Sequence, residues 1–267
     1  MAYDIKLLKT RIKSVDSTFH LTKAMGLVAS SKVRRAMVAM LNANAFAESL
    51  GECIRSLSSC RSCQNSPFMR IGGDRTRLII IAGDRGLAGG YNSNVFKTAK
   101  QFEDVEFVPI GKRACDKFGD GYVSCEKFSS SDAESLTDRL LKDFSEDKYD
   151  RLGIITTEYI TMMKQEPTVK WILPIEKSEG ASSGTIFEPN EETVFPTAVK
   201  LFVSGIIMAS VRESFACEVA ARRVAMDAAG KNAKKMIDDL TIKYNRARQG
   251  AITQEITEIV AGSGRSS

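Results

Sequence analysis

Apolar residues recur at helical spacing at both ends of the chain, in steps that alternate between three and four residues. The first run comprises Ile5, Leu8, Ile12, Val15 and Phe19. The second comprises Met226, Ala229, Ala233, Met236 and Leu240. This spacing aligns apolar side chains along one stripe of a helix, the stripe through which helices pack in a coiled coil. The pattern predicts helices over about residues 3–58 and 198–260.

The positions of the prolines support both helices. All six prolines lie between Pro67 and Pro196, so the 66 residues before them and the 71 after them contain none. At 1.5 Å per residue the two helices would be roughly 85 and 95 Å long. A compact globule of 267 residues has a radius of gyration of only ~18 Å. We therefore expect the two ends to pair as an antiparallel two-helix coiled coil that projects from a smaller body.

The middle of the chain alternates between β-branched apolar runs and short helical stretches. The runs that predict strands are 77–83, 106–111, 151–157 and 169–173, and residues 122–128 are expected to be extended. The stretches that predict helices are 92–103, 112–118 and 133–145, the last capped by Ser131 and Asp132. This order predicts a Rossmann-like three-layer α/β domain with a mainly parallel sheet. Pro109 weakens the second strand.

The predicted fold class is therefore α/β with long helices, an antiparallel coiled coil with an inserted α/β domain. We predict an N-terminal coiled-coil helix over 1–60, the α/β domain over 74–190 and a C-terminal coiled-coil helix over 197–267. Residues 56–73 have the composition of a linker, and residues 177–196 that of a loop leading into the last helix.

Positive charge is concentrated at the two ends. Residues 1–58 contain nine Lys and Arg against four Asp and Glu, and residues 197–267 contain eleven against seven. The ends therefore carry +9, and the middle carries −4 of the net +5. Basic helices favour acidic partner surfaces or nucleic acid, although the same residues also serve simply to solvate exposed helix faces. The start of the chain lacks the apolar core of a signal peptide, and the longest apolar run, 201–211, is too short to span a bilayer.

Candidate catalytic groups are sparse. The single histidine, His20, lies in the first predicted helix, and Asp238 and Asp239 are adjacent on the last one, so their side chains point in different directions. Cys60 and Cys63 have the spacing of a redox pair or of half a zinc site, but the remaining cysteines do not supply a matching pair for zinc. We expect free thiols, no metal, no cofactor and no enzymatic activity in the chain itself.

A glycine-rich loop is the strongest candidate for ligand chemistry. Gly83-Asp-Arg-Gly-Leu-Ala-Gly-Gly90 follows a predicted strand and precedes a predicted helix, a position that can cradle phosphate. Its spacing matches neither the dinucleotide-binding fingerprint nor the P-loop, so a tight turn or a partner surface is favoured. A nucleotide-binding enzyme that uses this loop stays open as an alternative. A basic coiled-coil scaffold or nucleic-acid binder is a second alternative, although its helices lack interleaved aromatic residues.

Two polar clusters and one apolar stripe on the end helices favour protein contacts. Lys32, Arg34 and Arg35 form a basic cluster, and the segment 244–249 is rich in hydrogen-bond donors. Beyond it, an apolar stripe has little of its own chain to pack against and should enter another protein. The stripe consists of Ile252, Ile256, Ile259 and Val260.

Three segments of the chain resemble motifs of the γ subunit of F-type ATP synthase. The first, LTKAMGLVASSKVRR over 21–35, is similar to the family's N-terminal I-T-K-A-M-x-x-V-A-A-S-K-x-R-R. The second, DRGLAGGYN over 84–92, is similar to D-R-G-L-[CA]-G-G-x-N. The third is the long segment 236–260, which resembles the C-terminal signature. The resemblance covers both ends of the chain and the order of elements between them.

This resemblance implies a central rotor shaft that is not itself catalytic. The coiled coil would turn inside a hexamer of alternating α and β subunits and couple ion flow through a membrane ring of c subunits to ATP synthesis or hydrolysis in β. It implies a hetero-oligomer with the α3β3 hexamer, the ε subunit and the c ring. It implies no nucleic acid and no membrane contact except through that ring. The implied location is peripheral, on the cytoplasmic face of a bacterial plasma membrane.

The resemblance also assigns contacts residue by residue. Lys23 and Met25 resemble positions that face acidic loops of β, and Arg248, Gln249 and Thr253 resemble contacts to β near the tip of the shaft. Phe187 and Glu188 resemble the region of the foot near the c ring and ε. The glycine loop resembles a part of the same foot. Its assigned residues are Asp84, Arg85, Gly86, Gly89 and Gly90.

Overall fold

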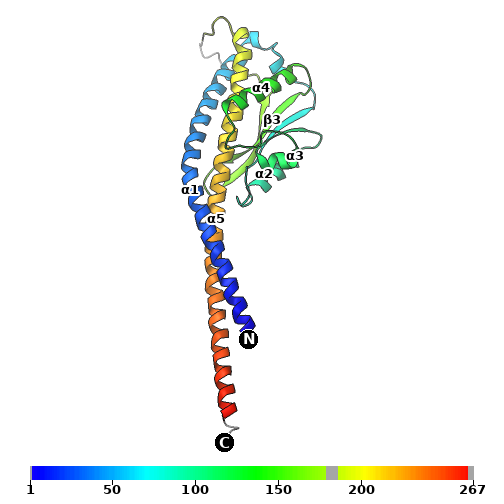
Figure 1. Ribbon diagram of the computed structural model, residues 1–267. Coiled ribbons are helices and arrows are strands. Elements are labelled where there is room, and N and C mark those ends of the chain that lie inside the picture. The colour runs from blue at the N-terminus through cyan, green and yellow to red at the C-terminus, as the bar shows by residue number, and fades with distance from the viewer. Residues whose placement is uncertain (1, 179–185, 264–267) are drawn as a thin grey trace. The chain divides into compact units, whose positions relative to one another are not determined.

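The computed structural model describes residues 2–178 and 186–263 (Figure 1). The helices are α1 Ala2–Ser58, α2 Tyr91–Ala99, α3 Lys112–Phe118, α4 Ser130–Ser145 and α5 Glu191–Ser263. The strands are β1 Thr76–Ile81, β2 Glu106–Ile110, β3 Arg151–Tyr159 and β4 Gln165–Leu173. Short 3₁₀ turns, Arg61–Cys63 and Pro67–Met69, follow α1. The chain divides into two compact units, residues 1–28 with 223–267, and residues 29–222, and both long helices contribute to each unit.

Both predicted long helices are confirmed, but α5 begins earlier than predicted. It starts at Glu191 instead of near residue 198. The side chain of Asn190 accepts a hydrogen bond from the backbone N–H of Thr193 at 2.8 Å and so caps the first turn. Pro196 therefore lies inside the helix, where its missing N–H removes one backbone hydrogen bond. The predicted domain limits stay a prediction, and residues 179–185 of the predicted loop lie outside the described residues.

In the unit formed by 1–28 and 223–267, the predicted stripe of α1 is confirmed as its half-buried face. On α5 the stripe was wrong at one position, because Met236 is 45% exposed and Ile237 is half-buried instead. Both side chains are apolar, so the sequence alone did not separate them. From Ala233 the stripe continues through Ile237, Leu240, Tyr244, Ala247 and Ala251.

The two helices run antiparallel within this unit, and glycine lets them approach closely. A β-carbon placed on Gly26 would lie 3.7 Å from Cβ of Met226, and one on Gly230 would lie 3.6 Å from Oγ1 of Thr22. Moving toward the start of α1 therefore means moving toward the end of α5. The predicted antiparallel pairing is confirmed here.

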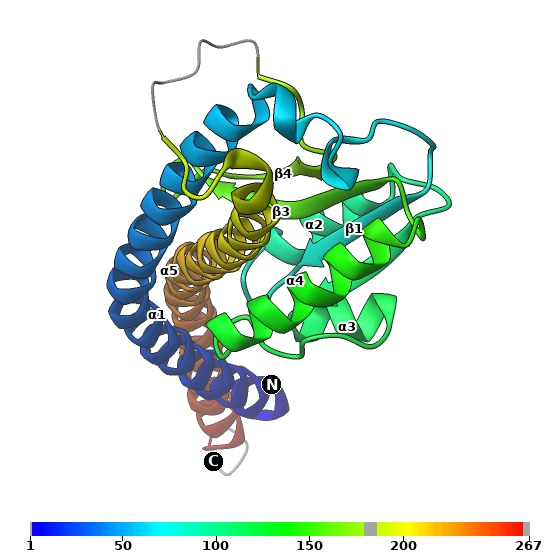
Figure 2. The same ribbon diagram turned by 90° about the horizontal axis from the view of Figure 1, so that it is seen from above.

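In the unit formed by 29–222, the sheet has the strand order β2-β1-β3-β4, of which β1, β3 and β4 are labelled in Figure 2. β1 is parallel to both β2 and β3, while β4 is antiparallel to β3. The predicted mainly parallel sheet is confirmed. Pro109 is tolerated because β2 is an edge strand, where the missing N–H leaves no ladder bond unmade.

Alternate residues of β1 face two different apolar layers. Ile79 and Ile81 pack with buried residues of α4 and α5, whereas Leu78 and Ile80 pack with buried residues of α2 and α3. Because successive side chains of a strand point to opposite faces, one apolar run serves both layers. The predicted three-layer arrangement is confirmed.

The part of α5 that belongs to this unit is apolar because it crosses the core. Val199, Val203, Ile207 and Val211 are fully buried. By length and composition α5 contains an 18-residue window apolar enough to cross a membrane, and half of that window is buried inside the protein. Burial against the sheet accounts for this apolar character.

The segment 122–128, which was expected to be extended, forms no strand. Tyr122 makes only an isolated bridge to Ile110. The backbone N–H groups that follow, those of Cys125 and Glu126, donate to the carboxylate of Asp84 instead of to a neighbouring strand. The cap of α4 also differs, because Ser129 caps the helix in a reciprocal capping box with Asp132.

A buried arginine joins the N-terminal ends of β1 and β2 to α4. Arg77 on β1 is 7% exposed, and its guanidinium donates to Glu106 Oε2 at 2.6 and 2.8 Å and to Asp143 Oδ2 at 2.7 Å. Lys148 Nζ donates to the other oxygen of Asp143 at 2.7 Å. The hydrogen bonds from Lys148 and then Arg77 hold the pKa of Asp143 below its ordinary value of 3.8. The stability of the fold should therefore depend on whether Asp143 is ionised.

We predict that Asp143→Asn makes stability less sensitive to acid. The folded pKa of Asp143 is lower than the unfolded one, so its stabilising contribution is complete above about pH 5 and is lost as the pH falls through the folded pKa. Urea unfolding at a series of pH values, followed by the fluorescence of the single tryptophan, Trp171, measures the free energy of unfolding. Between pH 7 and pH 3 that energy should fall less in the variant than in the unmodified chain.

Asp120→Asn is the matched control, because Asp120 is an exposed carboxylate that makes no ion pair within the described residues. Its pH dependence should follow that of the unmodified chain. Asp132 and Asp150 also have lowered pKa values, so part of the slope persists in Asp143→Asn. An unchanged slope in Asp143→Asn would contradict the assignment.

Candidate functional site

The glycine loop, residues 83–90, connects β1 to α2 and is tied to the first turn of that helix. The backbone N–H of Gly83 donates to Oδ1 of Asn92 at 2.9 Å, and Nδ2 of Asn92 donates to the carbonyl of Arg85 at 3.4 Å. Asn92 therefore closes the loop on itself. The predicted tight turn is what the structure contains.

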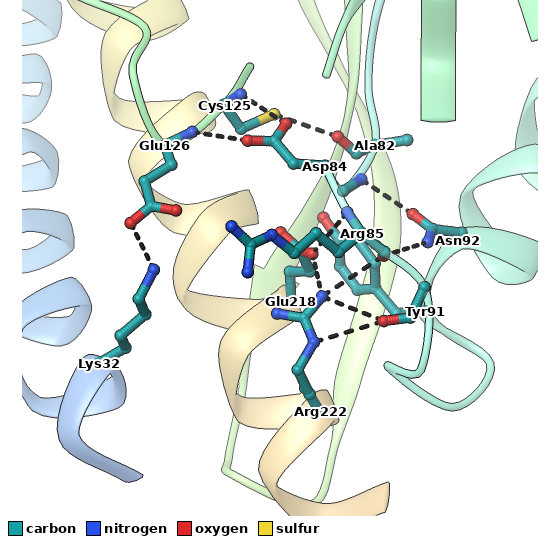
Figure 3. A network of polar contacts seen from close by, with 12 residues as sticks. Lys32, Ala82, Asp84, Arg85, Tyr91, Asn92, Cys125, Glu126, Glu218 and Arg222 are labelled. Carbon is teal, nitrogen blue, oxygen red and sulfur yellow. Dashed lines mark hydrogen bonds and ion pairs between the residues drawn. The ribbon is translucent and has the colours of Figure 1, made fainter. Parts of the chain in front are cut away.

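Asp84 connects the loop to the segment before α4. Its carboxylate accepts hydrogen bonds from Ser124 Oγ at 2.7 Å, from the N–H of Cys125 at 2.8 Å and from the N–H of Glu126 at 3.2 Å. A carboxylate that accepts several N–H and O–H donors holds an irregular segment in one conformation. Asp84 thereby positions Glu126 (Figure 3).

Glu218 and Arg222 connect the same loop to α5 (Figure 3). Glu218 is 1% exposed and accepts a hydrogen bond from the N–H of Arg85 at 3.3 Å. The guanidinium of Arg222 pairs with Glu218 and also donates to the carbonyl of Gly86 at 3.3 Å and that of Arg85 at 3.4 Å. The loop therefore lies on a buried ion pair of the long helix.

The close approach of the loop to α5 explains why residue 83 is glycine. A β-carbon at this position would lie 2.7 Å from Cδ of Glu218, closer than side-chain atoms approach one another. Any larger residue would displace either the loop or Glu218. The glycine thus serves helix packing, not a phosphate.

Tyr91 adds a second attachment to α5. Its hydroxyl lies 3.0 Å from the carbonyl oxygen of Ser214, to which it donates, and 2.5 Å from Oγ of the same residue. Burial raises the pKa of Tyr91 well above its ordinary value, so the phenol stays neutral and keeps its proton for these contacts.

The glycine loop has little capacity to bind phosphate. The N–H groups of Gly83 and Arg85 already donate to side chains, the carboxylate of Asp84 belongs to the loop itself, and that of Glu218 on α5 lies against it. Both carboxylates would repel a phosphate.

Within residues 2–178 and 186–263, no three His, Cys, Asp or Glu side chains gather as a metal site. The six cysteines are free thiols, and burial raises the pKa values of Cys125 and Cys217.

The structure brings Asp84, Arg85 and Gly86 together with two residues that sequence reasoning missed, Glu218 and Arg222. A signal for them was present, because a glutamate four residues before an arginine forms a pair on one helix face. Gly89 and Gly90 complete the turn, and Gly90 precedes the first residue of α2.

The other predicted site residues lie apart from this network, except for one. Lys32 on α1 pairs with Glu126 at 2.5 Å, and so joins the network through the segment that Asp84 holds. Arg34 and Arg35 are exposed on α1. Phe187 packs against the main core, and Glu188 is exposed.

In the unit formed by 1–28 and 223–267, Lys23 is exposed and Met25 is half-buried. Arg248, Gln249 and Thr253 are exposed on α5. Oγ1 of Thr253 donates to the carbonyl of Gln249 within the helix at 3.0 Å. These side chains are therefore available at the surface of the chain.

We predict that Arg222→Met frees the glycine loop. Removing the cation leaves Glu218 as a buried carboxylate with its partner lost, which destabilises by about 3–5 kcal/mol. Hydrogen exchange should accelerate at residues 83–92, and urea unfolding should show the loss of stability. Adding Glu218→Gln to Arg222→Met should recover part of that loss, because the unpaired charge is then removed.

Arg223→Met, one residue further along α5, is the matched control and should leave both measurements nearly unchanged. If Arg222→Met and Arg223→Met have equal stability and equal exchange at the loop, the buried pair does not hold the loop in place.

The chain is similar to proteins of known family over nearly its whole length. Residues 4–264 match the family described as ATP synthase. The ATP synthase gamma chain of Ruminococcus albus is 37% identical over 279 aligned positions, which cover 97% of this chain and 98% of the relative.

Solved structures share the fold at low sequence identity. A chain of the Euglena gracilis mitochondrial ATP synthase, in a structure of OSCP, F1 and the c-ring, matches with a TM-score of 0.65 at 18% identity and covers 98% of this chain and 94% of its own length. A chain of the central stalk and c-ring of the Tetrahymena thermophila enzyme matches with a TM-score of 0.61 at 19% identity, over 78% of this chain and 99% of its own. The family match and the bacterial relative establish that this chain belongs to the gamma chains of ATP synthase.

Proposed function

We propose that this chain is the central rotor shaft of an ATP synthase and couples rotation of a membrane ring to the catalytic cycle of neighbouring subunits. The observation that carries this proposal is the 37% identity to a gamma chain over 97% of the sequence. As a gamma chain it is a non-catalytic subunit, and catalysis takes place in the β subunits. The structures that share its fold contain F1 and a c-ring, partners that we extend to this chain.

The end of α5 suits a shaft because it exposes apolar side chains beyond the half-buried stripe. The half-buried stripe of α5 reaches Ala251, whereas Ile252, Ile256, Ile259 and Val260 are exposed. Exposed apolar side chains on a helix end favour burial in a partner. We propose that this end of α5 lies inside the α3β3 hexamer.

We further propose distinct contacts along the shaft. Lys23 and Met25 would face acidic loops of β, and Arg248, Gln249 and Thr253 would bind β near the tip. Because a rotating shaft presents a different face to each of three β subunits, contacts of this kind would bias each β toward a different conformation. A ligand or surface shifts an equilibrium only through such a difference in contacts.

The α/β domain, which we place at residues 74–190, would form the foot on the c ring beside ε. Phe187, Glu188 and the glycine loop are assigned there. Within the loop, Asp84 and Gly86 are engaged with other parts of the chain, which leaves the exposed side chain of Arg85 as the group best placed for a partner. The chain belongs to a membrane-associated complex, and we place it on the cytoplasmic face of a bacterial plasma membrane, reached only through the c ring.

The first test concerns the tip. We predict that Arg248→Ala combined with Gln249→Ala lowers ATP hydrolysis by the assembled complex roughly tenfold or more, because a charge-assisted hydrogen bond contributes about 1.5–3 kcal/mol. Removal of residues 259–267 should leave much of the activity, since apolar contacts are not directional. The measurement is the steady-state hydrolysis rate of complexes assembled with each form of the chain.

Asn232→Ala combined with Lys235→Ala is the matched control, because it removes one amide and one cation from exposed positions further back on α5. It should keep nearly full activity. The proposed contact fails if the truncation abolishes hydrolysis while the Arg248 and Gln249 double variant keeps it.

The second test concerns the contact of α1 with β. We predict that Met25→Lys strengthens the attachment of the shaft to acidic β loops and so uncouples ATP hydrolysis from ion transport. Both rates are measured in membrane vesicles that contain the assembled complex, and the ratio of transport to hydrolysis should fall. Ala24→Lys adds the same charge about 100° around the helix and should preserve the ratio. Unchanged coupling in Met25→Lys would remove this residue from the contact.

A further inference from the structure

A basic pocket of about 210 Å³ lies between α1 and α5 in the unit formed by 29–222. Its charged lining consists of Lys32 and Arg35 from α1, Arg212 from α5 and Glu126 from the segment before α4. Ala36, Ala39 and Phe215 complete the wall. The small side chains of the two alanines leave the space open. Neither the glycine loop nor the proposed contacts with β use this pocket.

We propose that this pocket binds a doubly charged oxyanion of the phosphate class. Three cations and one carboxylate give the lining a formal charge of +2. A dianion such as hydrogen phosphate would neutralise this charge. Guanidinium groups bind tetrahedral oxyanions through two parallel N–H donors, and two of the three cations are arginines.

The cations differ in how far their charge is already satisfied. Lys32 pairs with Glu126, and one nitrogen of Arg212 donates to the carbonyl of Phe128 at 3.0 Å, which fixes the guanidinium without neutralising it. Among the described residues Arg35 makes no ion pair. Two positive charges therefore remain for a ligand.

Glu126 acts in this arrangement as an internal competitor. Its carboxylate occupies one cation of the pocket, as an oxyanion would (Figure 3). The segment that carries it is held by Asp84, which accepts the N–H of Glu126 at 3.2 Å. A carboxylate supplies a single charge and leaves the two arginines unneutralised. A dianion would displace Glu126 from Lys32 and bind all three cations.

The experiment is equilibrium dialysis of the full chain against radiolabelled inorganic phosphate at fixed ionic strength. We expect saturable binding of one phosphate per chain, displaced by sulfate but not by chloride. Arg35→Gln should weaken phosphate binding roughly 10- to 100-fold, the effect of losing a charge-assisted hydrogen bond. Arg34→Gln is the matched control, since it removes the same charge from the neighbouring exposed position, outside the pocket lining, and should change binding less than about twofold.

Glu126→Gln supplies a test in the opposite direction. Removing the competing carboxylate should strengthen phosphate binding about 3- to 10-fold, consistent with a shift in a local charge pair. A misfolded variant does not produce such a gain, and Trp171 fluorescence checks the fold of each variant. The proposal is overturned if phosphate shows no saturable binding below about 10 mM, the weak limit for a site of this kind. It is equally overturned if Arg34→Gln and Arg35→Gln weaken binding alike.

Discussion

The position of the glycine loop in the α/β unit depends on one buried ion pair, Glu218 with Arg222 on α5. A carboxylate with 1% exposure is stable only when it is paired and hydrogen-bonded, and here the N–H of Arg85 and the guanidinium of Arg222 satisfy it. The same guanidinium also donates hydrogen bonds to two carbonyl groups of the loop. These contacts therefore offset the free-energy cost of removing the two charges from water, and they also hold the loop in place.

This pair determines where the loop and the groups that contact it are placed. Because the loop is held against α5, Gly83 has no room for a side chain. The loop in turn presents Asp84 to the segment before α4, and that segment carries Glu126 to Lys32 on α1. Two helices and two loops that are distant in sequence are thus joined by a short series of polar contacts.

The sequence predicted the regular elements well because their patterns are local. The stripe from Ile5 to Phe19 and the strands at 77–83 and 106–111 all follow from spacing and residue type. Where two local readings compete, the prediction was wrong. Met236 and Ile237 are both apolar, and only the packing of the helices shows that Ile237 lies on the stripe.

Long-range polar contacts were beyond the reach of the sequence. Residues 122–128 were expected to be extended, but the carboxylate of Asp84, about forty residues earlier, accepts hydrogen bonds from the backbone N–H groups of Cys125 and Glu126. The start of α5 was also predicted too late, because Asn190 caps the helix before Pro196. In the glycine loop, spacing excluded the standard phosphate motifs, yet nothing local identified Glu218 as its partner.

The basic residues of α1 show why charge counts alone do not identify a binding surface. Lys32, Arg34 and Arg35 are close together in sequence, but the helix turns them toward different surroundings. Lys32 is paired within the chain and lines a pocket with Arg35, whereas Arg34 does not line it. A cation becomes a recognition element when other groups fix the space around it and leave its charge unneutralised. The surplus charge of the chain is therefore divided between residues that solvate a helix and residues that the fold has arranged for a ligand.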